Sequence, residues 1–401
     1  TFVFDHYTVP AVIRFDDAVF DDAQVNAVVL VAERCTDAAV RSATTTRFVT
    51  ANSLQEPTQI KALVSNDDAP QGGFEADGDE TVQTKADCQV VPVSQSVLED
   101  RDATQGPLSR YFREPEFLRT LQQSEMLVPL QSLATVTYGT KTGNNEFFLL
   151  RETDLKDWPL ADRFYQPVLD DFGEVDGYVL NEGTSDTFIL DVHSYITSVN
   201  GDRETKGSAS KPRLQNVKEA LARDGYETLL AYVEQHEQEC GVRTSTDGVW
   251  FDLGALDAPD IVHPYRVHRS VRVLKNTGDV IPSNCANGID AGRGVDSDVL
   301  LAYLNSTLHA ALLEVWGQSE GGGSLEVLTG TLQRIPVADV RVFSDEECDA
   351  VVAAYEALKR GDENAQRRLD TAVLEAVGSD VDAATLRKAT EALTDDRLSL
   401  T

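Results

Sequence analysis

The residues with the clearest potential for chemistry lie in a short polar segment, residues 138–148, with two glycines and two adjacent asparagines. Glycine and asparagine accept positive φ angles, so this segment can turn sharply and present its backbone N–H groups. A lysine there can meet a phosphate, and an asparagine can form two hydrogen bonds with adenine in the major groove. A plain hairpin turn is the alternative that the spacing alone favours. The candidate DNA-contacting residues are Lys141, Thr142, Gly143, Asn144 and Asn145.

A second candidate group is a run of arginines and valines in residues 265–275. In an extended strand Arg266 and Arg272 would share one face with a histidine and a serine, while Arg269 would lie on the other. A ribbon face rich in hydrogen-bond donors is unusual in so acidic a chain, and it suits contacts with phosphates. The alternative is a solvated face whose charge is neutralised by nearby carboxylates.

Two further polar segments could also contact DNA. One follows an expected helix and contains three consecutive glycines, which favour a close approach of the backbone, although a linker is the alternative. The other is a cluster of cations in the polar loop 201–212 and just after it, for which a disordered surface loop is the alternative. The candidates in these segments are Gln318, Ser319, Gly321 and Gly322, together with Lys211 and Arg213.

The charge balance of the chain bears on the salt conditions in which the protein works and on its partners. The chain has 401 residues, 67 of them acidic and 35 of them Lys or Arg, for a net charge of -32. Acid excess with scarce lysine predicts a halophilic protein, since in molar salt the Debye length is only ~3 Å and surface carboxylates hardly repel one another. An ordinary acidic cytosolic protein is the alternative. Because counterion release contributes little at high salt, the net charge does not exclude a DNA partner.

Other sequence features narrow the class of protein. The 41% hydrophobic content is typical of a globular protein with a core. The chain has no run of ~20 apolar residues that could span a membrane, so no membrane partner is expected. The five scattered cysteines lack zinc-site spacing, which predicts buried free thiols in a reducing cytoplasm and no metal. The chain contains no two adjacent prolines, no FxGxG loop and no recognisable hydrolase or nuclease signature. No catalytic residue is therefore assigned.

The expected elements follow from periodicity and from turn residues. The apolar run 27–32 predicts a strand buried on both faces within a covered α/β sheet. Further strands are expected at 146–150, 249–251 and 265–274. Helices are expected at 213–223 and 226–239, and one helix runs from Asp296 to just before Gly317. The last ~60 residues are expected to be helical, with breaks at Gly361 and Gly378.

Several of these motifs, in the same order, resemble the C-terminal part of adenine-specific DNA methyltransferases with a fused target-recognition domain. These are the type IIG restriction-modification enzymes and their phage-defence relatives. The segments that carry the resemblance span nearly the whole chain: they are residues 13–30, the TGNNEFF segment within 139–148, Leu304-Asn305-Ser306 with the glycines 321–323 and residues 332–337, and residues 368–378.

The resemblance implies an α+β / α/β mixed fold. It predicts the edge of a methyltransferase α/β sheet in residues 1–106, a β-rich target-recognition domain in 107–340 and a helical segment in 341–401. It also implies sequence-specific binding to double-stranded DNA. The family's glycine loop and (N/D)PP(Y/F) tetrapeptide are absent, so the resemblance implies that a missing catalytic half precedes Thr1.

On this interpretation the chain itself binds no cofactor, and S-adenosylmethionine is expected in the full-length parent. The parent would flip the target adenine into its catalytic half, while this chain reads the flanking bases. A non-catalytic DNA-specificity or protein-interaction scaffold subunit is the alternative. The buried strand expected at 27–32 counts against that alternative, because a lone edge of an α/β sheet needs its neighbours.

Overall fold

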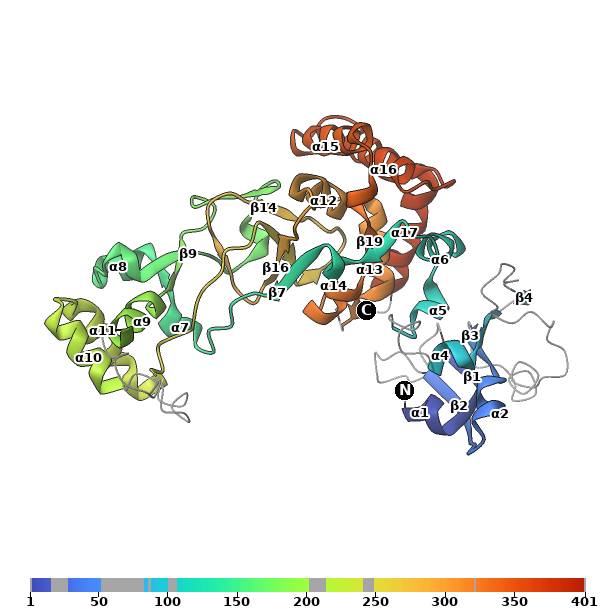
Figure 1. The fold of residues 1–401 in the computed structure, drawn as a ribbon, viewed down its shortest axis with the longest axis horizontal. Helices are drawn as coiled ribbons and strands as arrows, with labels where there is room; N and C mark the ends of the chain where they lie inside the picture. The colour runs from blue at the N-terminus through green and yellow to red at the C-terminus, as the bar shows by residue number, and fades with distance from the viewer. Residues whose placement is uncertain are drawn as a thin grey trace. The chain divides into compact units, whose positions relative to one another are not determined.

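The computed structural model describes residues 2–15, 28–51, 83–85, 88–99, 107–201, 214–240, 249–320 and 322–399. The chain forms two compact units, each including segments that are distant in the sequence (Figure 1). Unit 1 consists of Thr1–Leu130, Ser306–Asp339 and Asp370–Thr401, and unit 2 consists of Gln131–Asn305 and Val340–Leu369. The mixed α+β architecture with a helical C-terminus is confirmed. The predicted functional boundaries after residues 106 and 340 stay predictions.

The N-terminal part of unit 1 is a five-stranded sheet flanked by short helices. Its elements are α1 (Phe2–His6), β1 (Tyr7–Phe15), β2 (Val28–Arg34), α2 (Ala38–Ser42), β3 (Thr45–Ala51), β4 (Gln83–Lys85), β5 (Cys88–Ser94) and α4 (Gln95–Glu99). The strand order is β2-β1-β3-β5-β4. β1 runs antiparallel to β2 and parallel to β3, so the sheet is mixed. The side chains of β1 and β3 supply its apolar clusters.

The expectation of a strand buried on both faces at 27–32 is wrong. The strand exists as β2, but it is an edge of the sheet, and among the described strands it pairs only with β1. Val28, Val29 and Leu30 are 54%, 45% and 47% exposed. An apolar run shows that a strand would gain from burial, but not that a covering layer is present in the same chain.

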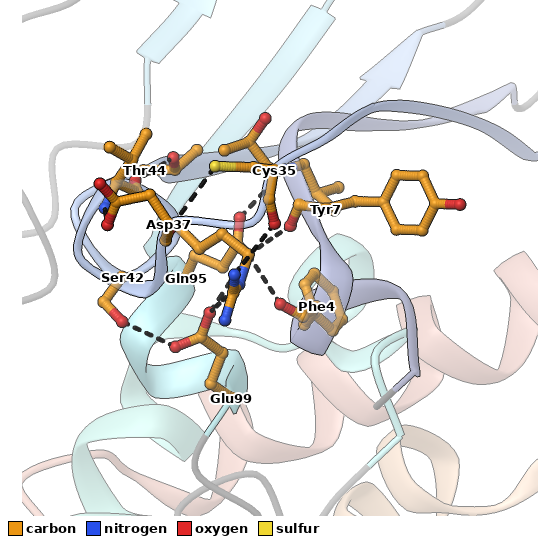
Figure 2. Close-up of polar contacts among 12 residues, drawn as sticks. Phe4, Tyr7, Cys35, Asp37, Ser42, Thr44, Gln95 and Glu99 are labelled. Atoms are coloured by element: carbon orange, nitrogen blue, oxygen red, sulfur yellow. Dashed lines mark hydrogen bonds and ion pairs between the residues drawn. The ribbon is translucent and has the colours of Figure 1, made fainter.

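A buried glutamine ties the short helices to this sheet. Gln95 is fully buried; its Oε1 accepts from Val9 N at 3.0 Å, and its Nε2 donates to Tyr7 O at 2.7 Å. Figure 2 shows the polar cluster around it. Glu99, one turn along α4, accepts from Ser42 Oγ at 2.8 Å and lies 3.7 Å from Arg41 Nε, which connects α2 to the same cluster. Both short helices are thereby fixed by side-chain hydrogen bonds.

The remainder of unit 1 is mainly helical. It contains α5 (Arg110–Arg113), α6 (Glu116–Gln122), β6 (Leu127–Pro129), α13 (Thr307–Trp316), β17 (Gln318–Ser319), β18 (Leu325–Glu326), α14 (Thr329–Arg334), β19 (Pro336–Ala338), the end of α16 (Ala365–Ala376) and α17 (Ala383–Ser399). β6 pairs with β19, and β17 pairs with β18. α13 packs along α17.

Unit 2 combines two sheets with a group of helices. Its elements are β7 (Ala134–Tyr138), α7 (Asn145–Phe148), β8 (Leu149–Arg151), α8 (Glu152–Asp157), β9 (Tyr165–Leu169), β10 (Val179–Leu180), β11 (Thr187–Leu190), α9 (His193–Gly201), α10 (Leu214–Arg223), α11 (Glu227–Cys240), β12 (Ile261–Pro264), β13 (Arg266–Val267), β14 (Leu274–Asn276), β15 (Ile281–Pro282), β16 (Ala286–Ala291), α12 (Ser297–Leu304) and α15 (Asp345–Lys359), with short 3-10 turns at Asp162–Phe164, Phe172–Glu174 and Val340–Val342. The sheet orders are β10-β14-β12-β16-β7 and β15-β9-β11-β8.

Several predicted helices are confirmed: α10 and α11 match 213–223 and 226–239, and the C-terminal helices break at Gly361 and Gly378, which have φ angles of 71° and 66°. The single helix expected from Asp296 is instead two helices, α12 and α13. They are separated at Asn305, whose side-chain nitrogen donates to Leu301 O and Val273 O at 3.0 Å each. Ser306 then caps the second helix, because its Oγ accepts from His309 N.

Three other expectations are corrected. Residues 249–251 are not a strand, and residues 146–150 divide into the end of α7 and the start of β8. The cysteines described with their side chains, at 35, 285 and 348, are free thiols, but they are half-buried rather than buried. Within the described ranges no single helix is long and apolar enough to cross a membrane, although α12 and α13 pass that test when counted together.

Candidate nucleic-acid interface

The glycine- and asparagine-rich segment leaves β7 of unit 2 as a tightly held turn. The backbone N–H of Gly139 donates to Ala286 O at 3.0 Å, and that of Thr140 donates to Pro282 O at 2.7 Å. A Cβ atom on Gly139 would lie 1.9 Å from Ser283 O, so only glycine fits there. Gly143 has a φ angle of 74°, which returns the chain toward the domain. The turn is therefore set by backbone contacts at its start and by glycine at its tip.

The two asparagines have different roles within this turn. Asn144 is the N-cap of α7, and its Oδ1 accepts from Phe147 N at 3.2 Å. Asn145 is exposed, and its Oδ1 accepts a hydrogen bond from the buried Thr142 hydroxyl. Lys141 and Gly143 are exposed as well. The turn thus presents Lys141 and Asn145 to solvent, and Asn144 and Thr142 hold its shape.

The two phenylalanines that end this motif anchor it to the core of unit 2. Phe147 and Phe148 are each 1% exposed. The Phe147 ring stacks on Tyr232 at 5.1 Å and lies 4.6 Å from Trp250, and the Tyr232 hydroxyl donates to Phe147 O at 2.7 Å. Such aromatic packing gives a rigid base. The exposed tip is therefore a short protrusion on a buried aromatic support.

The arginine run does not form the continuous ribbon expected from its alternation. Only Arg266 and Val267 are in β13, and the regular strand β14 resumes at Leu274. The prediction that Arg266 and Arg272 share one strand face is wrong for that reason. Arg266 and Arg269 are exposed, whereas Arg272 is half-buried. Arg272 is close enough to Tyr178 for its charge to favour the phenolate, although burial has the larger effect and raises the pKa of Tyr178.

An aromatic pair connects the two candidate segments of unit 2. The rings of Tyr138 and Tyr265 meet edge to face at 5.2 Å, and the guanidinium of Arg266 lies 5.9 Å from the Tyr265 ring centre. Tyr138 is 42% exposed, at the end of the edge strand β7. Both tyrosines are the first residues of the candidate segments, but sequence reasoning gave neither of them a role; the available signal was an aromatic residue at the start of each segment. The structure brings both segments to one exposed aromatic and cationic surface.

The remaining candidates belong to unit 1 or lie outside the described residues. Gln318 and Ser319 are exposed in β17 of unit 1, and Gly322 follows with a φ angle of 82°. Their neighbour Gly323 accepts a hydrogen bond at its carbonyl from the buried Arg397. Lys211, Arg213 and Gly321 lie outside the described residues. Across the ranges that are described, no group of three or more His, Cys, Asp or Glu side chains could hold a metal ion.

Comparison with known protein families shows to which family the chain belongs. Residues 111–374 match the model of the C-terminal domain of type II methyltransferase M.Eco57I. The chain belongs to this family. The predicted resemblance to the C-terminal part of a type II methyltransferase is thereby confirmed, whereas the predicted halophilic character stays a prediction. No curated protein matches the chain significantly.

Two solved structures provide context for this M.Eco57I C-terminal domain chain. The type IIG restriction endonuclease BpuSI has 15% sequence identity and a TM-score of 0.47, with 99% of this chain and 44% of BpuSI covered. The type IIL restriction-modification enzyme MmeI, solved in complex with DNA, has 11% identity and a TM-score of 0.43, with 90% of this chain and 50% of MmeI covered. The chain therefore spans about half the length of these enzymes or less.

Proposed function

We propose that this chain provides sequence-specific recognition of double-stranded DNA to an adenine-specific, S-adenosylmethionine-dependent methyltransferase of a restriction-modification or phage-defence system. The observation that carries the proposal is an exposed surface of unit 2, where the Tyr138–Tyr265 pair joins the turn that exposes Lys141 and Asn145 to the segment that exposes Arg266. A rigid polar protrusion flanked by aromatic and cationic groups is suited to a DNA groove. Membership in a methyltransferase family supports this assignment.

Within this proposal the exposed side chains divide the work of recognition. Asn145 reads a base edge, because its Oδ1 has a second lone pair beyond the Thr142 hydrogen bond and its amide nitrogen can donate. Asn144 acts on DNA only indirectly, since its oxygen caps α7. Lys141, Arg266 and Arg269 are exposed cations and contact phosphates, which fix the orientation of the domain without reading sequence.

The open edge of the N-terminal sheet supports a catalytic half as the intramolecular partner. Val28, Val29 and Leu30 of β2 expose apolar side chains and an unpaired strand edge in the described part of the chain. Such an edge is an aggregation hazard unless another strand or layer covers it. We assign that cover to the methyltransferase catalytic half, which would also hold S-adenosylmethionine and the flipped adenine.

A non-catalytic specificity subunit is a second candidate, and the same β2 edge favours it. A separate protein chain can cover an apolar strand edge as well as a preceding segment of the same chain can. In that case the methyltransferase would be a different polypeptide that copurifies with this one, and the full-length protein alone would not methylate DNA.

The decisive experiment is to express the full-length protein in a methylation-deficient host and to map N6-methyladenine across the genome. The proposal predicts methylation at one sequence motif, which disappears when the bases flanking the adenine are changed. Unmethylated DNA together with site-specific binding would favour the separate specificity subunit. The proposed function would be contradicted if the full-length protein neither methylated DNA nor bound it at a specific site.

A further inference from the structure

Unit 1 contains a cavity of about 320 Å³ that none of the candidate segments above contributes to. Its walls come from α5, α6, β6, the end of α13 and α14, so residues far apart in the sequence meet there. The floor is apolar, with Leu127, Pro129 and Pro336 among its residues. Three arginines reach into the lining, whereas Glu114 is its single acidic residue.

Arg110 is the most strongly oriented of these cations. Its guanidinium lies 4.9 Å from the Tyr111 ring centre and 6.0 Å from that of Trp316, and it donates to the Tyr111 hydroxyl at 3.2 Å. Within the described ranges, Arg110 forms no ion pair with an acidic side chain. Aromatic faces hold a guanidinium in place while its N–H edge stays available for a planar or tetrahedral anion.

The neighbouring groups fix the walls and set the charge. Trp316 Nε1 donates to Gln122 Oε1 at 3.3 Å, and Gln122 also donates to Glu114, which is only 6% exposed. Arg334 is exposed, and only its Nε donates to the helix backbone, at Gly330 O over 2.8 Å. Arg119 is the third cation of the lining. Three positive charges against one negative charge make the cavity cationic.

A cationic cavity in a chain with a net charge of -32 calls for an anionic ligand. Two arginines suit a phosphate, because their donors match its oxygens in pairs. The apolar floor suits the sugar next to that phosphate. We propose that the Arg110 cavity binds a phosphate of the DNA backbone outside the bases that are read. This inference rests on the proposed function, and it adds a positioning contact in unit 1 to the recognition surface of unit 2.

The test measures binding of the full-length protein to its cognate duplex and to a random duplex at several KCl concentrations. Arg110→Gln and Arg334→Gln each remove one cation from the cavity. Arg387→Gln is the matched control, because this exposed residue of α17 lies in the same unit and undergoes the same charge change. Each cavity variant is expected to weaken cognate and random binding alike, by about tenfold. The double variant is expected to flatten the slope of log K against log [KCl] by about one unit.

Three outcomes would overturn this inference. Cavity variants that bind both duplexes as the Arg387→Gln variant does would remove the cavity from the DNA interface, and the proposed function would stand. Saturable binding of inorganic phosphate that Arg110→Gln abolishes, without any loss of DNA affinity, would assign the cavity to a free anion. If the wild-type protein binds no DNA, both the proposed function and this inference are contradicted. Arg334→Gln keeps the test decisive if Arg110→Gln does not fold, since Arg334 is exposed.

Discussion

The two units bury their polar groups in different ways. In unit 1 a buried ion pair joins two helices: Arg397 donates from Nε and Nη2 to the two oxygens of Glu314, at 2.8 and 2.7 Å. In unit 2 the Nδ1–H of the fully buried His263 donates to Pro264 O at 2.8 Å, and desolvation by burial lowers the pKa of His263 to about 4. Unit 1 therefore contains a buried pair of charged side chains, Arg397 and Glu314, whereas in unit 2 the buried side chain of His263 is neutral at pH 7.

The cavities of the two units differ in the charge of the side chains that line them. The Arg110 cavity of unit 1 has three arginines and one glutamate, whereas a cavity of about 550 Å³ in unit 2 has Arg151 against Glu146, Asp154 and Asp170. Asn145 also lines this unit 2 cavity, so on the proposed function the DNA phosphates contact Lys141, Arg266 and Arg269, which do not line it. Arginines therefore outnumber acidic residues in the unit 1 cavity, whereas acidic residues outnumber arginines in the unit 2 cavity.

The largest expected effect comes from breaking the buried ion pair of unit 1. Arg397→Met leaves Glu314 buried without its main partner, although Arg113 remains 3.9 Å away. We expect the free energy of unfolding to fall by about 3–5 kcal/mol, measured by urea denaturation. The double variant Arg397→Met/Glu314→Leu should recover much of this loss. A loss below about 1 kcal/mol for the single variant would mean that unit 1 does not depend on internal charge.

The next effect concerns pH and unit 2. Because the pKa of His263 falls to about 4 in the fold, the unfolded chain binds a proton below pH ~6.5 that the folded chain refuses. The contribution of His263 to stability is therefore complete above that pH and is lost as the pH falls to 4, by about 3 kcal/mol at most. His263→Asn keeps a donor toward Pro264 O but does not titrate. Parallel stability profiles for wild type and variant between pH 7 and 4 would show that His263 is not buried neutral.

A smaller effect separates the two asparagines of the unit 2 turn. Asn144→Ala removes the N-cap of α7 and should cost about 1 kcal/mol of stability, whereas Asn144→Asp keeps the acceptor and should cost less. Thermal denaturation of the three proteins checks this order. If Asn144→Ala leaves stability unchanged but alters the DNA sequence bound, the cap is not its role, and Asn144 reads a base itself.

The sequence predicts those elements whose pattern is local. The ends of α10 and α11 are predicted to within one residue, and the breaks of the C-terminal helical segment at Gly361 and Gly378 are correctly predicted. The β2 strand is also predicted, but the prediction that both its faces are buried is wrong, because the burial of a strand depends on what lies beside it. The run 265–274 alternates like a strand, yet without a long partner strand only two of its residues pair in β13.

The candidate sites follow the same division. The turn at 139–148 is recognisable because its residues are consecutive, although the cap role of Asn144 requires the knowledge that a helix, not a strand, begins there. The Arg110 cavity was missed because Arg110, Trp316 and Arg334 come from distant parts of the chain. No spacing rule joins such residues; only the fold of unit 1 does.

The most direct test of the account is the ratio of cognate to random DNA binding by the full-length protein carrying Asn145→Ala. Asn145→Ala removes no helix cap, but it removes the acceptor of the buried Thr142 hydroxyl, so Thr142→Val, which breaks the same hydrogen bond and keeps Asn145, is the matched control for a change in the shape of the turn. The account predicts that affinity for the cognate duplex falls by about 1–3 kcal/mol, while affinity for random DNA changes much less. An equal loss on both duplexes, or no loss on either, would contradict the assignment of base recognition to this turn.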